Sequence, residues 1–117
     1  NLLAGTKRAA NILAIEEKKD KMRHSGSYQE KLLAENAELA LAAALESVKQ
    51  DTVAAINVEN FKGAMNAFSE LRKPVDAFFE KVTVNAEDAK LRENRLRLLS
   101  EIRETTLRVA DFSKISG

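Results

Sequence analysis

Hydrophobic residues recur three and four positions apart along most of this chain, which is the spacing of one face of an α-helix. Glycine occurs only four times and proline once, so the helices have few interruptions. The pattern predicts helices at about residues 2–22, 27–49, 57–73, 74–82 and 86–109. The predicted fold class is therefore all-α, a bundle of about four to five helices.

The first predicted helix has an apolar side and a charged end. Its apolar positions are Leu2, Leu3, Ala9, Ala10 and Leu13. It starts without a capping residue, so we expect the chain to begin inside a longer helix. Residues 16–27, EEKKDKMRHSGS, are charged and then contain glycine and serine. They predict a helix end that runs into an exposed, mobile loop.

The second and third helices each begin at a polar residue that can serve as a cap. Ser27 and Glu30 have capping-box spacing, and Asn57 can cap the third helix. The second helix presents one stripe of small and apolar residues: Leu33, Ala37, Ala40, Ala44 and Val48. The third presents Phe61, Ala64, Met65 and Phe68 on one face. We expect both stripes to belong to the core.

A corner follows at KPVDAFFEKVTVNAED, residues 73–88. Pro74 suits the first turn of a helix and disfavours helical geometry at Lys73, so the third helix is expected to end there. A short helix then places four apolar side chains inward: Val75, Phe78, Phe79 and Val82. The β-branched run at residues 82–84 stops it, and Asn85 is predicted to cap the last helix.

The last predicted helix is the longest regular one. Its core stripe is Leu91, Leu98, Ile102 and Val109, with Leu99, Leu107 and Ala110 beside it. Arg95 falls on that stripe, where an arginine needs an acidic partner, carbonyl groups or a ligand. Residues 111–117 are expected to form a frayed tail, with Phe112 as its anchor.

Composition supports one helical domain of 117 residues, with 44% hydrophobic and 32% charged residues. The net charge is only +1, but the two ends are basic and the middle is acidic. A basic face forms if the ends pack side by side; otherwise these charges are solvated helix faces. The sequence has no signal-peptide pattern and no apolar run long enough to span a membrane, so a cytoplasmic location is expected.

The sequence offers little for catalysis. It contains no cysteine and one histidine, His24, which excludes a thiolate zinc site and a Cys-His pair. It also lacks the glycine-rich motifs that cradle phosphates. We therefore expect no catalytic residues, no metal ligands and no cofactor-binding residues in this domain.

Two short basic patches are the candidate binding residues. Lys7, Arg8 and Asn11 lie within about one turn in the first helix, and Arg92, Asn94 and Arg95 lie within one turn of the last. Lysine and arginine can bind phosphates, and arginine and asparagine can also contact base edges. They can equally hydrogen-bond to neighbouring helices, and neither patch is interleaved with aromatic residues.

These segments also resemble a known family. KRAANIL, residues 7–13, resembles the K-R-[VI]-x-N-I-L element of the DALR anticodon-binding domains of arginyl- and glycyl-tRNA synthetases. Residues 74–102 and 107–113 resemble the C-terminal end of the bacterial glycyl-tRNA synthetase β subunit, including P-V-D-x-F-F, L-R-x-N-R-L and L-R-V-A-D. The departures are Ala9, where a branched residue is usual, and Thr83, where methionine is common.

The resemblance implies a helical bundle that contacts the anticodon region of glycine tRNA, here as a C-terminal piece of a longer chain. It implies that glycine activation, with ATP and magnesium, belongs mainly to the α subunit. Lys7, Arg8, Asn11, Arg92, Asn94 and Arg95 are then expected to include the tRNA contacts. Asn11 and Arg95 can instead be buried links between helices. The alternatives are a helical protein-interaction module without nucleic-acid binding and the equivalent domain of an arginyl-tRNA synthetase.

Overall fold

The computed structural model describes residues 4–24, 26–84 and 87–116, with side chains described for residues 6–112 of these. The helices are α1 (Ala4–Asp20), the 3-10 helix η1 (Glu30–Leu32), α2 (Asn36–Asn57), α3 (Phe61–Ser69), α4 (Arg72–Lys81) and α5 (Ala89–Ser116). The described residues form no strand, and the predicted all-α bundle is confirmed. Nor do they include a helix with the length and apolar character that a membrane crossing requires.

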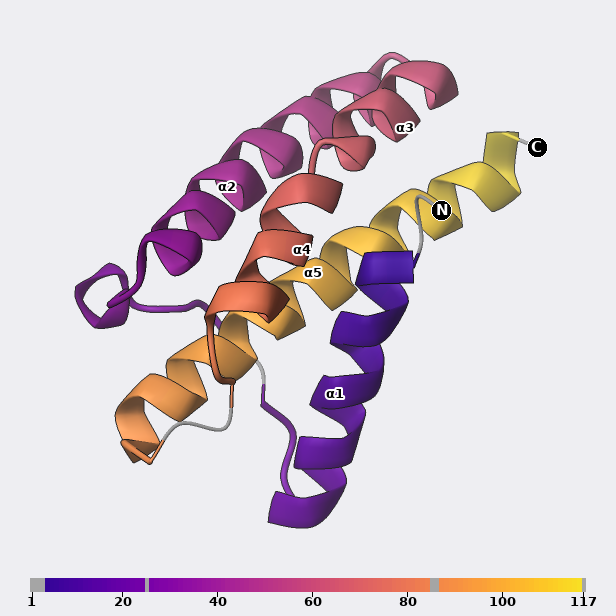
Figure 1. The fold of residues 1–117 in the computed structure, drawn as a ribbon. Helices are drawn as coiled ribbons and strands as arrows, with labels where there is room; N and C mark the ends of the chain where they lie inside the picture. The colour runs from indigo at the N-terminus through magenta and orange to yellow at the C-terminus, as the bar shows by residue number, and fades with distance from the viewer. Residues whose placement is uncertain (1–3, 25, 85–86, 117) are drawn as a thin grey trace.

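The bundle is organised around α5 and α2, the two longest helices, which run side by side (Figure 1). α3 and α4 fold back against α2, and α1 packs on α5 and also touches α4. One main core cluster fills the space between these helices. Its fully buried large side chains include Leu13, Leu41, Leu45, Phe68, Leu71, Phe78, Leu96, Leu98, Leu99 and Ile102. Truncating one of them to alanine typically costs 2–5 kcal/mol.

The segment after α1 differs from the exposed loop that the sequence predicts. α1 ends at Asp20, and Lys21 takes a left-handed conformation with φ of 57°. His24 then turns inward and is only 2% exposed. Its backbone N–H donates to the Glu17 carboxylate at 2.7 Å, which ties the segment back onto α1. The prediction of exposure is therefore wrong at His24, because carboxylates from α1 and α5 surround it.

The predicted start of α2 at Ser27 and Glu30 is wrong. The Asn94 side chain takes both backbone groups of Gln29: its Oδ1 accepts from Gln29 N at 2.6 Å and its Nδ2 donates to Gln29 O at 3.1 Å. With these groups engaged, only the short η1 forms there. α2 begins at Asn36, where the Glu38 carboxylate accepts from Glu35 N at 3.0 Å. The predicted stripe is confirmed as buried at Ala37 and Val48, whereas Ala40 is exposed and Leu41 and Leu45 enter the core as well.

α2 continues past the predicted end at Lys49, so Asn57 is its last residue and not the cap of α3. The buried Thr52 hydroxyl donates to Val48 O at 2.8 Å and keeps this β-branched residue within the helix. Asn60 caps α3 instead, because its Oδ1 accepts from Gly63 N at 2.9 Å. A side chain at residue 63 would collide with that cap, since a Cβ there would lie 2.5 Å from Asn60 Nδ2.

The corner around α4 keeps its predicted role but moves its boundaries. α3 ends at Ser69, and Lys73 lies within the first turn of α4 together with Pro74. Pro74 is tolerated there because its missing N–H would have no partner inside the helix, and the prediction of non-helical geometry at Lys73 is wrong. Val75 and Phe78 are fully buried as predicted, whereas Phe79 is only partly buried and meets Phe78 edge-on, with ring centroids 5.6 Å apart.

α5 begins later and ends later than the sequence predicts. Asn85, the predicted cap, lies outside the described residues. Asp88 caps the helix: its Oδ1 accepts from Lys90 N at 2.9 Å. At the other end the helix runs to Ser116, so the predicted frayed tail is helical. The Phe112 anchor is confirmed, at 7% exposure and with its ring centroid 6.0 Å from that of Phe61. Leu107 is half exposed and does not belong to the core.

Arg95 finds both of the protein partners that its place on an apolar stripe requires. It is 6% exposed, and its guanidinium donates to the Thr83 carbonyl at 2.7 Å and to Glu38 Oε1 at 3.0 Å. Glu38 itself is fully buried. The same Glu38 oxygen accepts from the backbone at the start of α2, so this one ion pair connects α5, α2 and the corner after α4.

We expect Arg95→Ala to destabilise the fold by about 3–5 kcal/mol, because it leaves the buried Glu38 carboxylate without its counter-ion. Urea denaturation followed by circular dichroism measures the loss. Arg108→Ala is the matched control, since Arg108 lies exposed on the same helix. A loss for Arg95→Ala no larger than that of the control would contradict the structural role.

Candidate nucleic-acid interface

The predicted patch on α5 faces the inside of the molecule. Asn94 is 1% exposed and is committed to Gln29, and Arg95 is 6% exposed and committed to Glu38 and Thr83. Arg92 lies against α1, where its Nη2 is 2.7 Å from both Glu16 Oε1 and Asp20 Oδ2. These three residues therefore hold α5 to its neighbours, and Asn94 and Arg95 are almost completely buried while doing so.

Acidic residues of α1 form a polar seam with α5 around this patch. The hydrogen bond from Arg92 lowers the pKa of Asp20 below its ordinary value of 3.8, and the contact with His24 adds to this. The hydrogen bond from Arg103 likewise lowers the pKa of Glu17 below 4.5. His24 sits between two carboxylates, with Nε2 2.6 Å from Asp20 Oδ2 and Nδ1 2.5 Å from Glu93 Oε2. Sequence spacing gave no signal for this seam, because the arginines of α5 lie 72 to 86 positions from their partners in α1.

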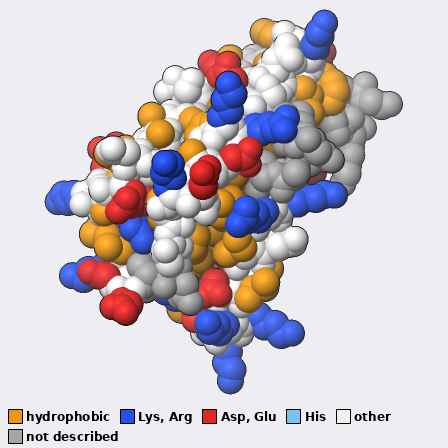
Figure 2. Space-filling model, in the orientation of Figure 1, with side chains coloured by type: hydrophobic (Ala, Val, Ile, Leu, Met, Phe, Trp, Pro, Cys, Tyr) orange, Lys and Arg blue, Asp and Glu red, His pale blue; other side chains and the backbone are white. Residues whose placement is uncertain are grey.

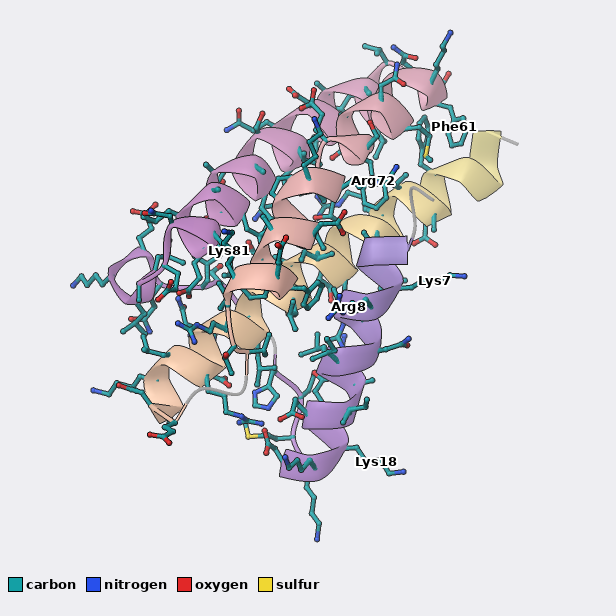
Figure 3. All side chains as sticks on the ribbon, viewed as in Figure 1. Lys7, Arg8, Lys18, Phe61, Arg72 and Lys81 are labelled. Atoms are coloured by element: carbon teal, nitrogen blue, oxygen red, sulfur yellow. The ribbon has the colours of Figure 1, made fainter. Side chains whose placement is uncertain are left out.

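The predicted patch on α1 is different because it is exposed. Lys7, Arg8 and Asn11 all lie at the surface, on the outer side of a helix whose Ala9 and Leu13 enter the core. Figure 3 shows Lys7 and Arg8 pointing away from the α1 backbone, with Arg8 toward α4. The patch on α1 and the α1 residues that Arg92 contacts therefore lie at different places along this helix. Lys7 to Asn11 occupy its first half, whereas Arg92 contacts Glu16 and Asp20, which lie about 12–18 Å farther along the helix axis than Arg8.

Arg8 has an aromatic neighbour that the sequence did not suggest. Its guanidinium carbon lies 4.6 Å from the centroid of the Phe79 ring, which α4 brings alongside α1. Among the described residues, no carboxylate forms an ion pair with Lys7 or Arg8. The basic residues and the aromatic ring come from helices about 70 residues apart, so only the fold could combine them.

The face that carries this pair is mixed in charge. Figure 2 shows lysine and arginine side chains around an apolar area between α4 and α1, with acidic side chains among them. Arg72 and Lys81 of α4 lie on the same side of the molecule as Arg8 (Figure 3). α4 also carries the exposed Asp76. The predicted basic face is therefore present only over a small area. That area is the first half of α1, which contains no acidic residue.

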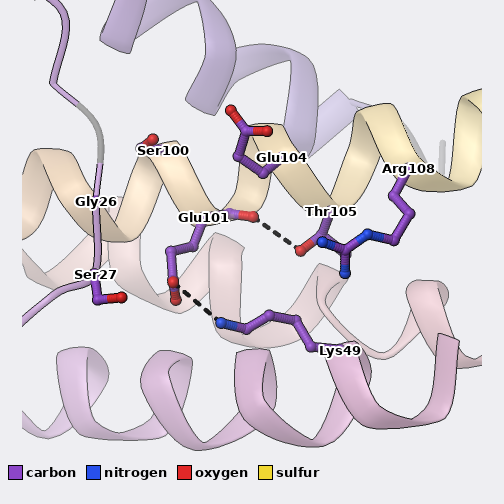
Figure 4. A pocket seen from close by; sticks show the side chains of 8 residues that line it. All are labelled: Gly26, Ser27, Lys49, Ser100, Glu101, Glu104, Thr105 and Arg108. Atoms are coloured by element: carbon purple, nitrogen blue, oxygen red, sulfur yellow. Dashed lines mark hydrogen bonds and ion pairs between the residues drawn. The ribbon is translucent and has the colours of Figure 1, made fainter. Parts of the chain in front are cut away.

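Several hollows lie along α5, and two of them are close to the candidate residues of α1 or between the two longest helices. One, of about 180 Å³, is mainly apolar and is lined by Thr6, Lys7, Ala10, Arg103, Thr106 and Leu107. The other, of about 320 Å³, lies between α2 and α5 (Figure 4). In it, Lys49 Nζ pairs with Glu101 Oε1 at 3.0 Å, and the Thr105 hydroxyl donates to the Glu101 carbonyl at 2.9 Å. Lys49 is therefore already paired, and the carboxylates of Glu101 and Glu104 line the same hollow, so this hollow is a poor candidate for an anionic ligand.

Comparison with known proteins decides what kind of helical bundle this is. The family model for the DALR anticodon binding domain matches residues 2–110. The chain belongs to this family. A curated relative, the "Glycine--tRNA ligase beta subunit" of Rhodospirillum centenum, is 57% identical over 118 residues, which cover 100% of this chain. The chain spans only 16% of the length of that relative.

The family membership confirms the predicted resemblance and favours a nucleic-acid role over a helical interaction module without one. It covers both predicted patches, since they lie within residues 2–110. That Lys7, Arg8, Asn11, Arg92, Asn94 and Arg95 include RNA contacts stays a prediction. The geometry divides them into an exposed group on α1 and an engaged group on α5.

The polar seam predicts a pH dependence of stability. Asp20 and Glu17 have lowered pKa values in the folded chain, so they stabilise it above their ordinary values and lose that contribution as the pH falls through the folded values. We expect Arg92→Gln to be less stable than wild type at pH 6–7, with the difference narrowing as the pH falls below about 4. Urea midpoints measured across this range, with Arg108→Gln as control, provide the test. A difference that stays constant down to pH 2 would contradict this coupling.

Proposed function

We propose that this chain is the anticodon-binding domain of a glycine--tRNA ligase β subunit and that it binds the anticodon region of glycine tRNA. The observation that carries the proposal is the 57% identity to such a subunit along the whole of this chain. The same relative makes the equivalent domain of an arginyl-tRNA synthetase the weaker candidate. The exposed cations of α1 supply the charge that an RNA backbone requires.

Within the enzyme the domain has a binding role and not a catalytic one. ATP, magnesium and the activation of glycine belong mainly to the α subunit, and the rest of the β subunit connects this domain to it. The domain itself takes no cofactor and works in the cytoplasm, where tRNA is charged. In this arrangement a glycine tRNA is held at its anticodon end here while its acceptor end reaches the α subunit.

The RNA contacts lie on α1, at Lys7, Arg8 and Asn11. These side chains are exposed, and the two cations have no acidic partner among the described residues. Arg92, Asn94 and Arg95 of α5 act as the scaffold behind α1, since their polar groups already serve the fold. An RNA contact at α5 would have to break an ion pair or a backbone hydrogen bond that the bundle uses.

Lys7→Ala in the full-length β subunit, assembled with its α subunit, tests the assignment. We expect glycine tRNA to bind about five- to tenfold more weakly, because one phosphate contact is lost. Fluorescence anisotropy at several salt concentrations measures both the affinity and its salt slope, which becomes shallower by about one unit. Lys62→Ala is the matched control, since Lys62 is an exposed lysine on α3 outside both patches.

Equal affinity and salt slope for Lys7→Ala and Lys62→Ala would contradict the RNA contact at α1. An enzyme that lacks this domain but is otherwise unchanged is the second comparison. If it bound glycine tRNA as tightly as the intact enzyme, the proposed function itself would fail. The rate of glycine attachment to tRNA, measured at limiting tRNA, should follow the binding data.

A further inference from the structure

Arg8 contacts an aromatic ring, whereas three arginines of α5 pair with carboxylates. Arg92, Arg95 and Arg103 all donate to carboxylates within 3.0 Å. Arg8 instead lies over the Phe79 ring at 4.6 Å, and none of the described carboxylates pairs with it. Its guanidinium is positioned by an aromatic face and still exposed to solvent, so its hydrogen-bond donors are available to a ligand.

The Phe79 ring is itself firmly placed. It packs on the main core cluster and meets the fully buried Phe78 at a centroid distance of 5.6 Å and an interplanar angle of 71°. A cation over an aromatic face is attracted by the ring quadrupole, and the contact reduces the freedom of the arginine side chain. α4 therefore serves as a support for the Arg8 guanidinium, and Arg8 remains exposed to solvent.

We propose that an unpaired base of the bound RNA loop stacks on the outer face of the Arg8 guanidinium, with Phe79 as the support beneath it. Single-stranded RNA loops are recognised by stacking their splayed bases on aromatic rings or on the planes of arginine guanidinium groups. This assignment rests on the proposed function and names the part of the RNA that this surface takes: a base, and not only the phosphate backbone.

The neighbours of Arg8 suit such a loop. Asn11 lies one turn farther along the exposed side of α1, and its amide can donate to and accept from a base edge. Lys7 lies next to Arg8 and can neutralise a phosphate, as a compact point charge does. If charge alone mattered at residue 8, no aromatic support would be needed, because a flexible lysine also binds phosphate as a point charge.

The test separates the planar face from the charge. The probe is the anticodon stem-loop of glycine tRNA, with 2-aminopurine at one loop position at a time, and the protein is the assembled full-length enzyme. Arg8→Lys keeps the charge and removes the planar face. Phe79→Leu keeps an apolar side chain and removes the ring. Thermal unfolding of each variant checks that the bundle is retained.

We expect each variant to bind the stem-loop about fivefold or more weakly, in the range of one lost stacking contact. The double variant should lose less than the product of the two single losses, because both act on one stack. At one loop position, the 2-aminopurine emission should rise on binding to wild-type enzyme, because the base leaves the stack of the loop, and it should rise less with either variant. Phe79→Leu should leave the salt slope unchanged, in contrast to Lys7→Ala.

Wild-type affinity for Arg8→Lys would overturn the stacking assignment, and so would an equal change in emission with Arg8→Lys and with wild type at every loop position. In either case a weakened Lys7→Ala variant would leave the proposed function standing. If wild-type enzyme did not bind the stem-loop at all, the proposed function would fail and the stacking assignment with it. The two failures are therefore distinguishable within one series of titrations.

Discussion

The buried contact between Arg95 and Glu38 is the interaction on which the rest of the bundle depends. Both groups are almost completely removed from water, and they are held there because Glu38 Oε1 accepts from the Arg95 guanidinium and from Glu35 N, while Arg95 also donates to the Thr83 carbonyl. Glu38 stands at the first turn of α2, and Thr83 lies in the extended corner after α4. One side chain of α5 therefore sets the start of α2 and the position of the corner together.

The same turn of α5 anchors two further segments. Asn94 engages both backbone groups of Gln29, and Arg92 ties the second half of α1. Three polar residues within one turn of α5 thus hold three different segments: Arg92 holds α1, Asn94 holds the η1 segment and Arg95 holds the corner after α4. Directional contacts of this kind fix how the elements meet, whereas apolar packing alone tolerates sliding. The consequence for function is that Arg92 and Arg95, whose residue type suits phosphate binding, are already paired with carboxylates of the bundle.

Much of the fold could be predicted from the sequence, because helical periodicity reflects burial directly. Phe68, Val75, Phe78, Leu98 and Ile102 were placed in the core by spacing alone, and they are buried. The boundaries were less predictable, because residues distant in sequence decide them. Ser27 has the spacing of a cap, yet Asn94 holds the next turn out of the helix from 65 positions away.

The candidate site was predictable in part for the same reason. Lys7, Arg8 and Asn11 share one exposed side of a helix, which spacing indicates well. The Phe79 ring beneath Arg8 comes from another helix, and no local pattern could connect the two. Arg8 and Arg92 are equally basic in the sequence. Only the folded structure shows that Arg92 pairs with carboxylates of α1 while Arg8 lies exposed over an aromatic ring.

The central claim is that α1 faces the RNA while the Arg92 to Arg95 turn supports it from behind. Photo-crosslinking tests this most directly, with 4-thiouridine placed in the anticodon loop of glycine tRNA bound to the assembled enzyme. The account predicts crosslinks within residues 7–12 of α1 and the adjoining part of α4 at Phe79. Crosslinks confined to residues 89–97 of α5, with none on α1, would contradict it.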